Sequence, residues 1–246
     1  MNQNELGPFR WENDEVEVFI PYSGAGVGTA IILTSKFTGK MMLLDVGDGT
    51  LRDLLGLGST QFVNDLELVA ISHGHFDHMG GIHTILGFLR MMNRIEKLHI
   101  LLPVECTEAI DAIRGFRRVY KESLPFEFWY HELTPGSEFD TDFFKVASIG
   151  VEHFGAENKE THDVFMPALG YRIRIGDTTI GYTGDTRPCA GAEEVVLDTD
   201  LAIIEATRKV TPESERRVHL SEEEANALGK LAKDYLLVHR IPVIED

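Results

Sequence analysis

Apolar runs with β-type patterning dominate the first third of the chain. Residues 16–33 predict two strands around a glycine-rich turn, and residues 41–45 predict another strand that ends at Asp45. A third apolar run, residues 66–73, ends where several histidines gather. Sheet structure is therefore expected to lead directly into this histidine-rich segment.

Helical periodicity follows that segment. Residues 80–93 place Ile82, Ile85, Leu86 and Leu89 on one helix face, and residues 104–122 repeat such a pattern. Between them, "LHILLP" predicts a buried strand that Pro103 ends.

The second half of the chain repeats this order of strands and then helix. Residues 143–153 alternate and predict a strand ending at His153, and residues 169–185 predict a hairpin turning at Gly176-Asp177. Apolar strands are expected to end at Glu205 and near His239, with a helix over 222–233 between them. Ser221 and Glu224 form the capping box that predicts where this helix begins.

Strands followed by helices, twice over, predict an α/β protein with two sheets covered by helices. The alternation in "FFKVASIGVEH" favours sheets with one buried face over a doubly wound parallel sheet. No linker or low-complexity tract interrupts the chain, so residues 1–246 are expected to form a single domain.

Composition narrows the functional classes. The 23 Lys and Arg residues against 40 Asp and Glu give a net charge of −17, which argues against non-specific nucleic-acid binding. Two cysteines are too few for a disulfide framework, the start is polar and acidic, and no apolar run is long enough to span a membrane. These features predict a cytoplasmic protein without a membrane partner.

The segment "ISHGHFDHMGG" carries the chemistry. His73 and His75 are two positions apart in an extended segment, so their side chains point the same way and can bind one metal ion. Asp77 and His78 follow as the chain turns into the next helix, and can reach a second ion. Surface histidines without a ligand are the structural alternative, which this concentration of donors disfavours.

Further donors stand at predicted strand ends. His153, Asp185 and His239 each follow an apolar or alternating run. Each of them alone could cap a turn, but the neighbouring histidine cluster makes a metal role more credible. His162 is an alternative to His153, which is preferred because it directly ends the predicted strand.

These motifs resemble the metallo-β-lactamase superfamily. The "HGHFDH" motif, "YTGDT" and the late "LLVH" carry the resemblance over nearly the whole chain, and "YTGDTRPC", "IIEATR" and "HLSEEEANALGKLAKDYLLVHR" resemble its ribonuclease Z branch. The resemblance implies a four-layer αββα sandwich and a metal-dependent hydrolase with two divalent ions, Zn²⁺ first and Mn²⁺ or Fe²⁺ as alternatives.

The resemblance also implies a role for each residue. Catalytic roles fall to Asp77, to His219 as the proton donor, and to Glu205 as its orienting carboxylate. The first ion would be bound by three histidines, His73, His75 and His153. The second would be bound by an aspartate and two histidines, Asp77, His78 and His239. Asp185 would bridge the two ions.

One departure from the branch concerns its long arm that holds transfer RNA. His153 and Asp185 are only 32 positions apart, which leaves no room for that arm between them. The sequence therefore favours a phosphodiesterase acting on a small phosphodiester or nucleotide. A centre of two divalent ions, two aspartates and hydroxide, with a net charge of about +1, suits such an anion.

Several alternatives stay open at this point. They are a thioesterase or lactonase of the same superfamily, a ribonuclease Z-type RNA endonuclease, and a non-catalytic metal-binding protein. A homodimer is also compatible with the sequence. Arg114, Arg117, Arg118 and Lys121 could contact RNA, although a solvated helix face explains them better.

Overall fold

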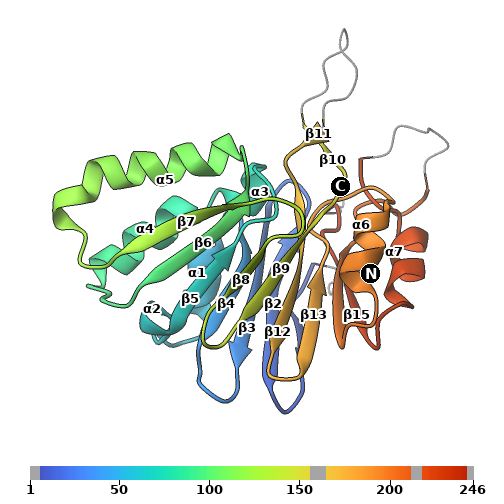
Figure 1. The fold of residues 1–246 in the computed structure, drawn as a ribbon, viewed down its shortest axis with the longest axis horizontal. Coiled ribbons are helices and arrows are strands. Elements are labelled where there is room, and N and C mark those ends of the chain that lie inside the picture. The colour runs from blue at the N-terminus through green and yellow to red at the C-terminus, as the bar shows by residue number, and fades with distance from the viewer. Residues whose placement is uncertain (1–5, 156–164, 212–217, 243–246) are drawn as a thin grey trace, which may run out of the picture. The chain divides into compact units, whose positions relative to one another are not determined.

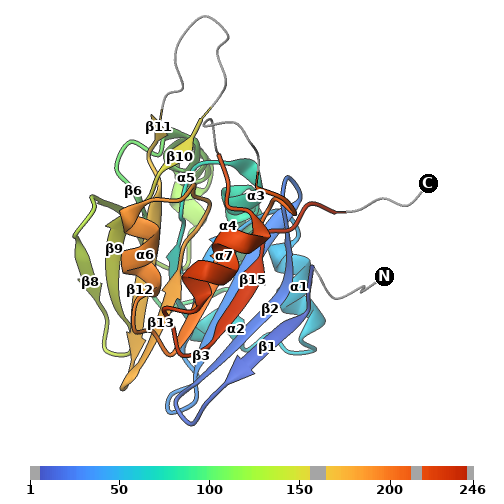
Figure 2. The same cartoon turned by 90° about the vertical axis from the view of Figure 1, so that its right-hand side faces the viewer.

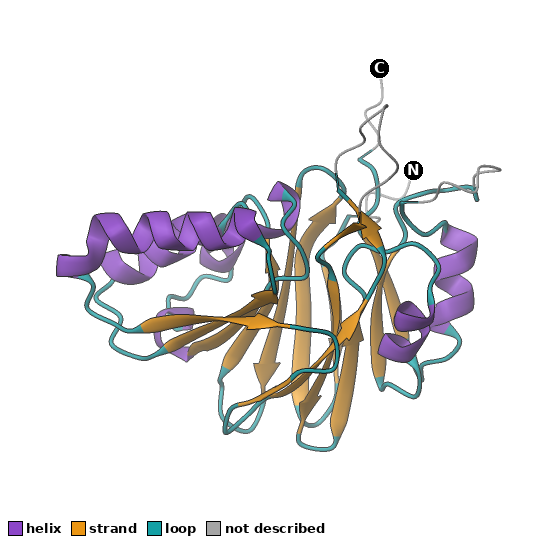
Figure 3. Ribbon diagram, turned by 45° about the horizontal axis from the view of Figure 1, so that its top comes forward, coloured by secondary structure: helices purple, strands orange, loops and turns teal. Residues whose placement is uncertain are grey.

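The computed structural model describes residues 6–155, 165–211 and 218–242. The chain divides into two compact units, Met1–Leu133 (unit 1) and Thr134–Asp246 (unit 2). Each unit contains one large sheet, which Figure 3 shows with its strands and helices coloured by type. The prediction that residues 1–246 form one domain stays a prediction.

The sheet of unit 1 has seven strands in chain order. Strands β1 to β4 are antiparallel neighbours, whereas β4, β5, β6 and β7 run parallel. The strands are β1 Phe9–Glu12, β2 Val16–Gly24, β3 Gly28–Ser35, β4 Met41–Val46, β5 Leu66–Ala70, β6 Leu98–Pro103 and β7 Phe128–Leu133.

The helices of unit 1 pack on one face of this sheet. They are α1 Thr50–Gly56, α2 Phe62–Asp65, α3 Phe76–Met79, α4 Ile82–Met91 and α5 Thr107–Tyr120, and η1 Lys121–Ser123 is a 3₁₀ turn. Ile85 of α4 and Ile113 of α5 join Val69 of β5 in one buried cluster, and Figure 1 shows both helices along this face. The apolar periodicity of residues 80–93 and 104–122 thus produces the predicted packing.

The sheet of unit 2 has six strands, in the order β15-β14-β13-β12-β9-β8. Strands β13, β14 and β15 run parallel, and β12 is antiparallel to both β13 and β9. The strands are β8 Glu138–Asp140, β9 Lys145–Gly150, β12 Leu169–Ile175, β13 Thr178–Tyr182, β14 Leu201–Glu205 and β15 Tyr235–Val238, beside a separate pair, β10 His153–Phe154 and β11 Phe165–Met166.

Two helices cover one face of the unit 2 sheet: α6 Ala190–Val196 and α7 Glu222–Gly229 (Figure 2). Val195 and Ala225 pack with Ile204 of β14 in a buried cluster. The capping box is present, since the Ser221 hydroxyl accepts from Glu224 N and the Glu224 side chain accepts from Ser221 N. This cap fixes the start of α7 as predicted.

Three local predictions need correction. The helix predicted over 222–233 ends at Gly229, where an added Cβ would lie 2.5 Å from the Tyr235 ring. The alternating strand β9 ends at Gly150, so His153 begins β10 rather than ending that strand. The alternation predicted one-sided burial, yet the central strands β4 and β14 are buried at every position.

Parallel strands gather side chains at one sheet edge within each unit. In unit 1, Asp45 lies near the carboxyl end of β4, and His73 follows the carboxyl end of the parallel strand β5. In unit 2, Asp185, Glu205 and His239 lie at the carboxyl ends of β13, β14 and β15. Across the described ranges, no helix has the length and apolar character needed to cross a membrane.

Candidate active site

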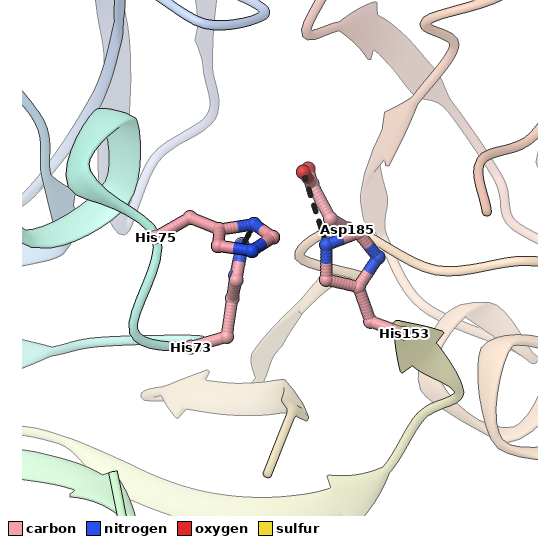
Figure 4. A group of neighbouring side chains, drawn as sticks. All are labelled: His73, His75, His153 and Asp185. Carbon is pink, nitrogen blue, oxygen red and sulfur yellow. Dashed lines mark hydrogen bonds and ion pairs between the residues drawn. The ribbon is translucent and has the colours of Figure 1, made fainter. Parts of the chain in front are cut away.

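In unit 1, four predicted donors lie on the loop and helix that follow β5. His73 is fully buried, and its Nε2 lies 3.0 Å from His75 Nδ1, so two imidazole nitrogens converge as two ligands of one ion would (Figure 4). His78 Nε2 lies 3.9 Å from Asp77 Oδ2. The short helix α3 places Asp77 and His78 side by side, as the turn after the extended segment predicted.

A buried carboxylate orients these donors. Asp45 Oδ2 lies 2.7 Å from His78 Nδ1 and accepts from the Ser72 hydroxyl at 2.8 Å. Ser72 Oγ in turn lies 3.0 Å from His73 Nδ1. Because Nδ1 of both histidines faces an acceptor, Nε2 of each keeps its lone pair for a metal. We name Asp45, Ser72, His73 and His78 the Asp45 network.

Glycines allow the backbone to pass close to these donors. An added Cβ at Gly47 would lie 2.1 Å from the Asp77 carbonyl oxygen, and one at Gly81 would lie 2.4 Å from the Gly47 carbonyl oxygen. Gly26, at φ 69°, donates its N–H to Asp77 Oδ2 at 2.6 Å. The glycine-rich turn between β2 and β3 therefore fixes the orientation of the Asp77 carboxylate.

In unit 2, the remaining predicted donors meet at the carboxyl ends of the strands. His153 Nε2 lies 4.0 Å from Asp185 Oδ2, and both side chains are buried (Figure 4). Asp185, His219 and His239 each offer a ligand atom within 4.8 Å of the others. His162, the alternative to His153, lies outside the described residues.

The histidines of unit 2 are also oriented through Nδ1. His153 Nδ1 lies 3.3 Å from the Val218 carbonyl oxygen, and His239 Nδ1 lies 2.8 Å from Thr207 Oγ1. Since Thr207 donates its hydroxyl proton to Glu205, its oxygen is left to accept from His239. Nε2 of His153 and His239 is then the available ligand atom, as for His73 and His78.

Glu205 and His219 form a second pair. Glu205 is 1% exposed, and its Oε1 lies 3.0 Å from His219 Nδ1 while accepting from Thr186 N at 3.1 Å and Leu220 N at 3.2 Å. Its Oε2 accepts from the N–H and hydroxyl of Thr207. We name Glu205, Thr186, Thr207, His219 and Leu220 the Glu205 network.

This network determines the protonation of His219. Burial lowers the pKa of the imidazole, and Arg208 lowers it further, but the charge and hydrogen bond of Glu205 together with the charge of Asp185 raise the pKa to about 9. A raised pKa favours the imidazolium form of His219 at neutral pH, and its side chain is 19% exposed. A cation with Nδ1–H on Glu205 keeps Nε2–H free to give a proton.

The predicted donors fit a divalent metal, since imidazole nitrogens and carboxylate oxygens converge within each unit. Hydrogen bonds at Nδ1 fix the orientation of the histidine rings. Local sequence patterns do not reveal the roles of Asp45, Ser72 and Thr207. Asp45 ends a predicted strand, and its φ of 59° is the left-handed conformation that His239 also adopts. An aspartate or a histidine in a sequence gives no sign that its backbone adopts this conformation.

The chain is similar to known proteins in both sequence and fold. Residues 50–239 match a family model described as "Beta-lactamase superfamily domain". Ribonuclease Z of Pyrococcus abyssi is 28% identical over 249 residues, which cover 84% of this chain and 79% of that protein.

Two solved structures share the fold. The metallo-β-lactamase fold protein YhfI of Bacillus subtilis has a TM-score of 0.71 at 19% identity, covering 95% of this chain and 89% of its own. The short form of human tRNase Z has a TM-score of 0.70 at 22% identity, covering 91% and 94%. The predicted metallo-β-lactamase fold is therefore confirmed.

Proposed function

Because the chain belongs to the beta-lactamase superfamily, as a ribonuclease Z-like metal-dependent hydrolase, we propose that it is a two-metal phosphodiesterase acting on small phosphodiesters or nucleotides. The donor sets of the two units and the Glu205–His219 pair support this proposal. A cytoplasmic location and a homodimer stay predictions.

The proposed ligands follow the family pattern. His73, His75 and His153 would bind a first ion, and Asp77, His78 and His239 a second, with Asp185 bridging them. Four of these histidines support this assignment, because a partner at Nδ1 makes Nε2 the expected metal ligand. They are His73, His78, His153 and His239. Zn²⁺ suits these donors, and Mn²⁺ or Fe²⁺ are the alternatives. Such ions supply an activated water and positive charge against the developing anion.

The His219–Glu205 hydrogen bond of 3.0 Å is the observation that carries the proposal. An alkoxide leaving a phosphodiester needs a proton, and His219 can deliver one from Nε2 while Glu205 holds Nδ1–H. A thioester or lactone hydrolase has less need of such an acid, since thiolate is a good leaving group. The fixed imidazolium therefore favours phosphodiesters with poor leaving groups.

A leaving-group comparison tests the proposal. The zinc-loaded protein is assayed on bis-p-nitrophenyl phosphate and on a dinucleoside monophosphate, beside a thioester and a lactone. His219→Ala should lower kcat by ~10²–10⁴ on the dinucleoside and much less on the p-nitrophenyl diester, because p-nitrophenolate leaves without a proton.

The matched control is His83→Ala, which removes an exposed histidine from α4 and should leave both rates unchanged. Equal losses on the two diesters would refute the role of His219. Turnover of the thioester or lactone without any phosphodiester hydrolysis would refute the phosphodiesterase itself.

Ribonuclease Z-type cleavage of RNA is the second candidate. The 28% identity to the Pyrococcus abyssi protein favours it, whereas the spacing of 32 positions between His153 and Asp185 leaves no room for the transfer-RNA-binding arm. The net charge of −17 also opposes long polyanions. Site-specific cleavage of a precursor transfer RNA at physiological salt would establish this second candidate instead.

A further inference from the structure

A cavity of about 440 Å³ opens in unit 2 beside the Glu205 network. Its walls are two chain segments that directly continue from proposed active-site residues. One segment, residues 207–210, follows Glu205, and the other, Arg240 and Ile241, follows His239. Thr207, whose hydroxyl contacts both Glu205 and His239, forms the wall nearest these residues.

The wall is built on a fixed backbone. Arg208 N donates to the Leu220 carbonyl at 3.1 Å, and the Arg208 carbonyl accepts from Glu222 N at 2.8 Å, so Arg208 is joined to the start of α7. Arg240 donates to the Ala206 carbonyl and to Glu222 Oε2, both at 3.0 Å. These contacts tie both segments to the start of α7 and so fix the walls of the cavity.

The cavity carries cationic side chains in an acidic chain. Carboxylates outnumber cations 40 to 23, and some exposed cations pair with them, as Lys233 does with Asp200 and Lys36 with Glu12. Within the described ranges, Arg208 and Lys209 have no ion pair, although both are exposed at the cavity. Two exposed cations side by side in one cavity suit an anionic group as its ligand.

The same cavity also presents apolar surface. Val210 is 77% exposed and Ile241 is 56% exposed, and both line it. An apolar wall beside exposed cations suits a nucleoside that carries a phosphate, because the base would contact the aliphatic side chains while the phosphate meets Arg208 and Lys209.

We propose that this cavity binds the terminal phosphate of a small phosphodiester substrate, with Arg208 and Lys209 as its ligands and Val210 and Ile241 against the attached nucleoside. The inference rests on the proposed function, since it names the part of the substrate that lies away from the cleaved bond. The substrate class is then a phosphodiester with a second, terminal phosphate, such as a 5′-phosphorylated dinucleotide.

Binding of an uncleavable ligand tests the cavity independently of catalysis. The probes are diadenosine dinucleotides joined by a methylphosphonate, with and without a 5′-terminal phosphate, titrated into the zinc-loaded protein. In the unsubstituted protein the terminal phosphate should lower Kd about tenfold, as expected for two charge-assisted contacts. In the double variant Arg208→Gln/Lys209→Gln it should lower Kd less than about twofold.

The matched control removes two exposed cations of unit 2 far from this cavity, Lys145→Gln and Arg174→Gln. It makes the same change in net charge and should keep the tenfold preference. An equal loss in this control, or a preference that survives in the Arg208/Lys209 variant, would overturn the inference. So would an unsubstituted protein that binds both probes equally.

The natural dinucleotides, with and without the 5′-phosphate, then test the proposed function separately. Binding that depends on Arg208 and Lys209, without hydrolysis of either dinucleotide, would reject the phosphodiesterase and still support the cavity. Hydrolysis of both at equal kcat/KM would support the phosphodiesterase and reject the cavity.

Discussion

Asp45 in unit 1 and Glu205 in unit 2 are both buried carboxylates at the ends of sheet strands, but they hold different neighbours. Asp45 contacts His78 and Ser72, behind residues that we propose as metal ligands. Glu205 contacts the proposed acid His219 directly and reaches the proposed ligand His239 only through Thr207. The comparison indicates that similar burial can orient either a metal ligand or a proton donor.

Glu205→Gln should have the largest effect, because it removes the charge that keeps His219 protonated. We expect kcat on a dinucleoside monophosphate to fall by ~10²–10⁴, with a much smaller loss on bis-p-nitrophenyl phosphate. Steady-state rates on both substrates measure this, with bound zinc determined in the same preparation. Equal losses on the two substrates would show that Glu205, like Asp45, supports the metal ligands rather than the proton donor.

Asp45→Asn should weaken metal binding instead. With the asparagine oxygen in the place of Oδ2, its NH₂ group would face the Ser72 backbone N–H that Oδ1 now accepts, and the negative charge behind His78 would be lost. Zinc affinity should therefore fall by ~10–100-fold. Competition with a chelating dye measures the affinity. At saturating zinc, the ratio of rates on substrates with good and poor leaving groups should match that of the unsubstituted protein. A change in that ratio would contradict the separate roles of Asp45 and Glu205.

Thr207→Val tests the connection between Glu205 and His239. Loss of the hydroxyl should weaken zinc binding by about tenfold, because His239 Nδ1 loses the Thr207 oxygen as its acceptor. This lies at the lower end of the losses seen when partners of metal ligands are removed. Thr199→Val is the control, since Thr199 is also buried and its hydroxyl donates to the Val196 carbonyl. Both variants should lose ~1 kcal/mol of stability in urea unfolding, but only the first should change zinc affinity.

Substitution of Asp200 should have the smallest effect. This carboxylate accepts hydrogen bonds from Lys233 and Thr179 and is not among the proposed metal ligands. Partial burial raises the pKa of Asp200, while hydrogen bonds from Lys233 and Thr179 lower it more, so its pKa lies below its usual range. A lowered pKa contributes stability above the unfolded value, and this is lost as pH falls through the folded value. Asp200→Asn should cost ~1 kcal/mol at pH 7 and flatten the acid limb of the unfolding curve, with zinc affinity unchanged.

The sequence revealed unit 1's donors more directly than it revealed the residues behind them. His73, His75, Asp77 and His78 fall within six positions, so their spacing alone indicated a metal site. Asp45 lies 33 positions before His78, and only the parallel pairing of β4 and β5 brings its strand end beside that motif. Local patterns do not encode such pairing.

Strand and helix prediction succeeded where the apolar pattern was long. Residues 80–93 and 104–122 became α4 and α5, whereas α1 and α6 were missed because each has only seven residues. The edge strand β7 was missed as well, since "FWYHEL" mixes polar with aromatic positions. Short elements take their stability from packing more than from their own sequence.

Asp45 and His239 share a left-handed backbone at φ 59°, a conformation that residues with a Cβ adopt at a cost of about 1 kcal/mol and glycine adopts without it. Laboratory evolution would expose that cost. Libraries selected for heat resistance alone should drift toward glycine or asparagine at both positions, whereas libraries selected for turnover should retain aspartate and histidine. Sequencing the two populations would then separate the residues kept for their chemistry from those kept for folding.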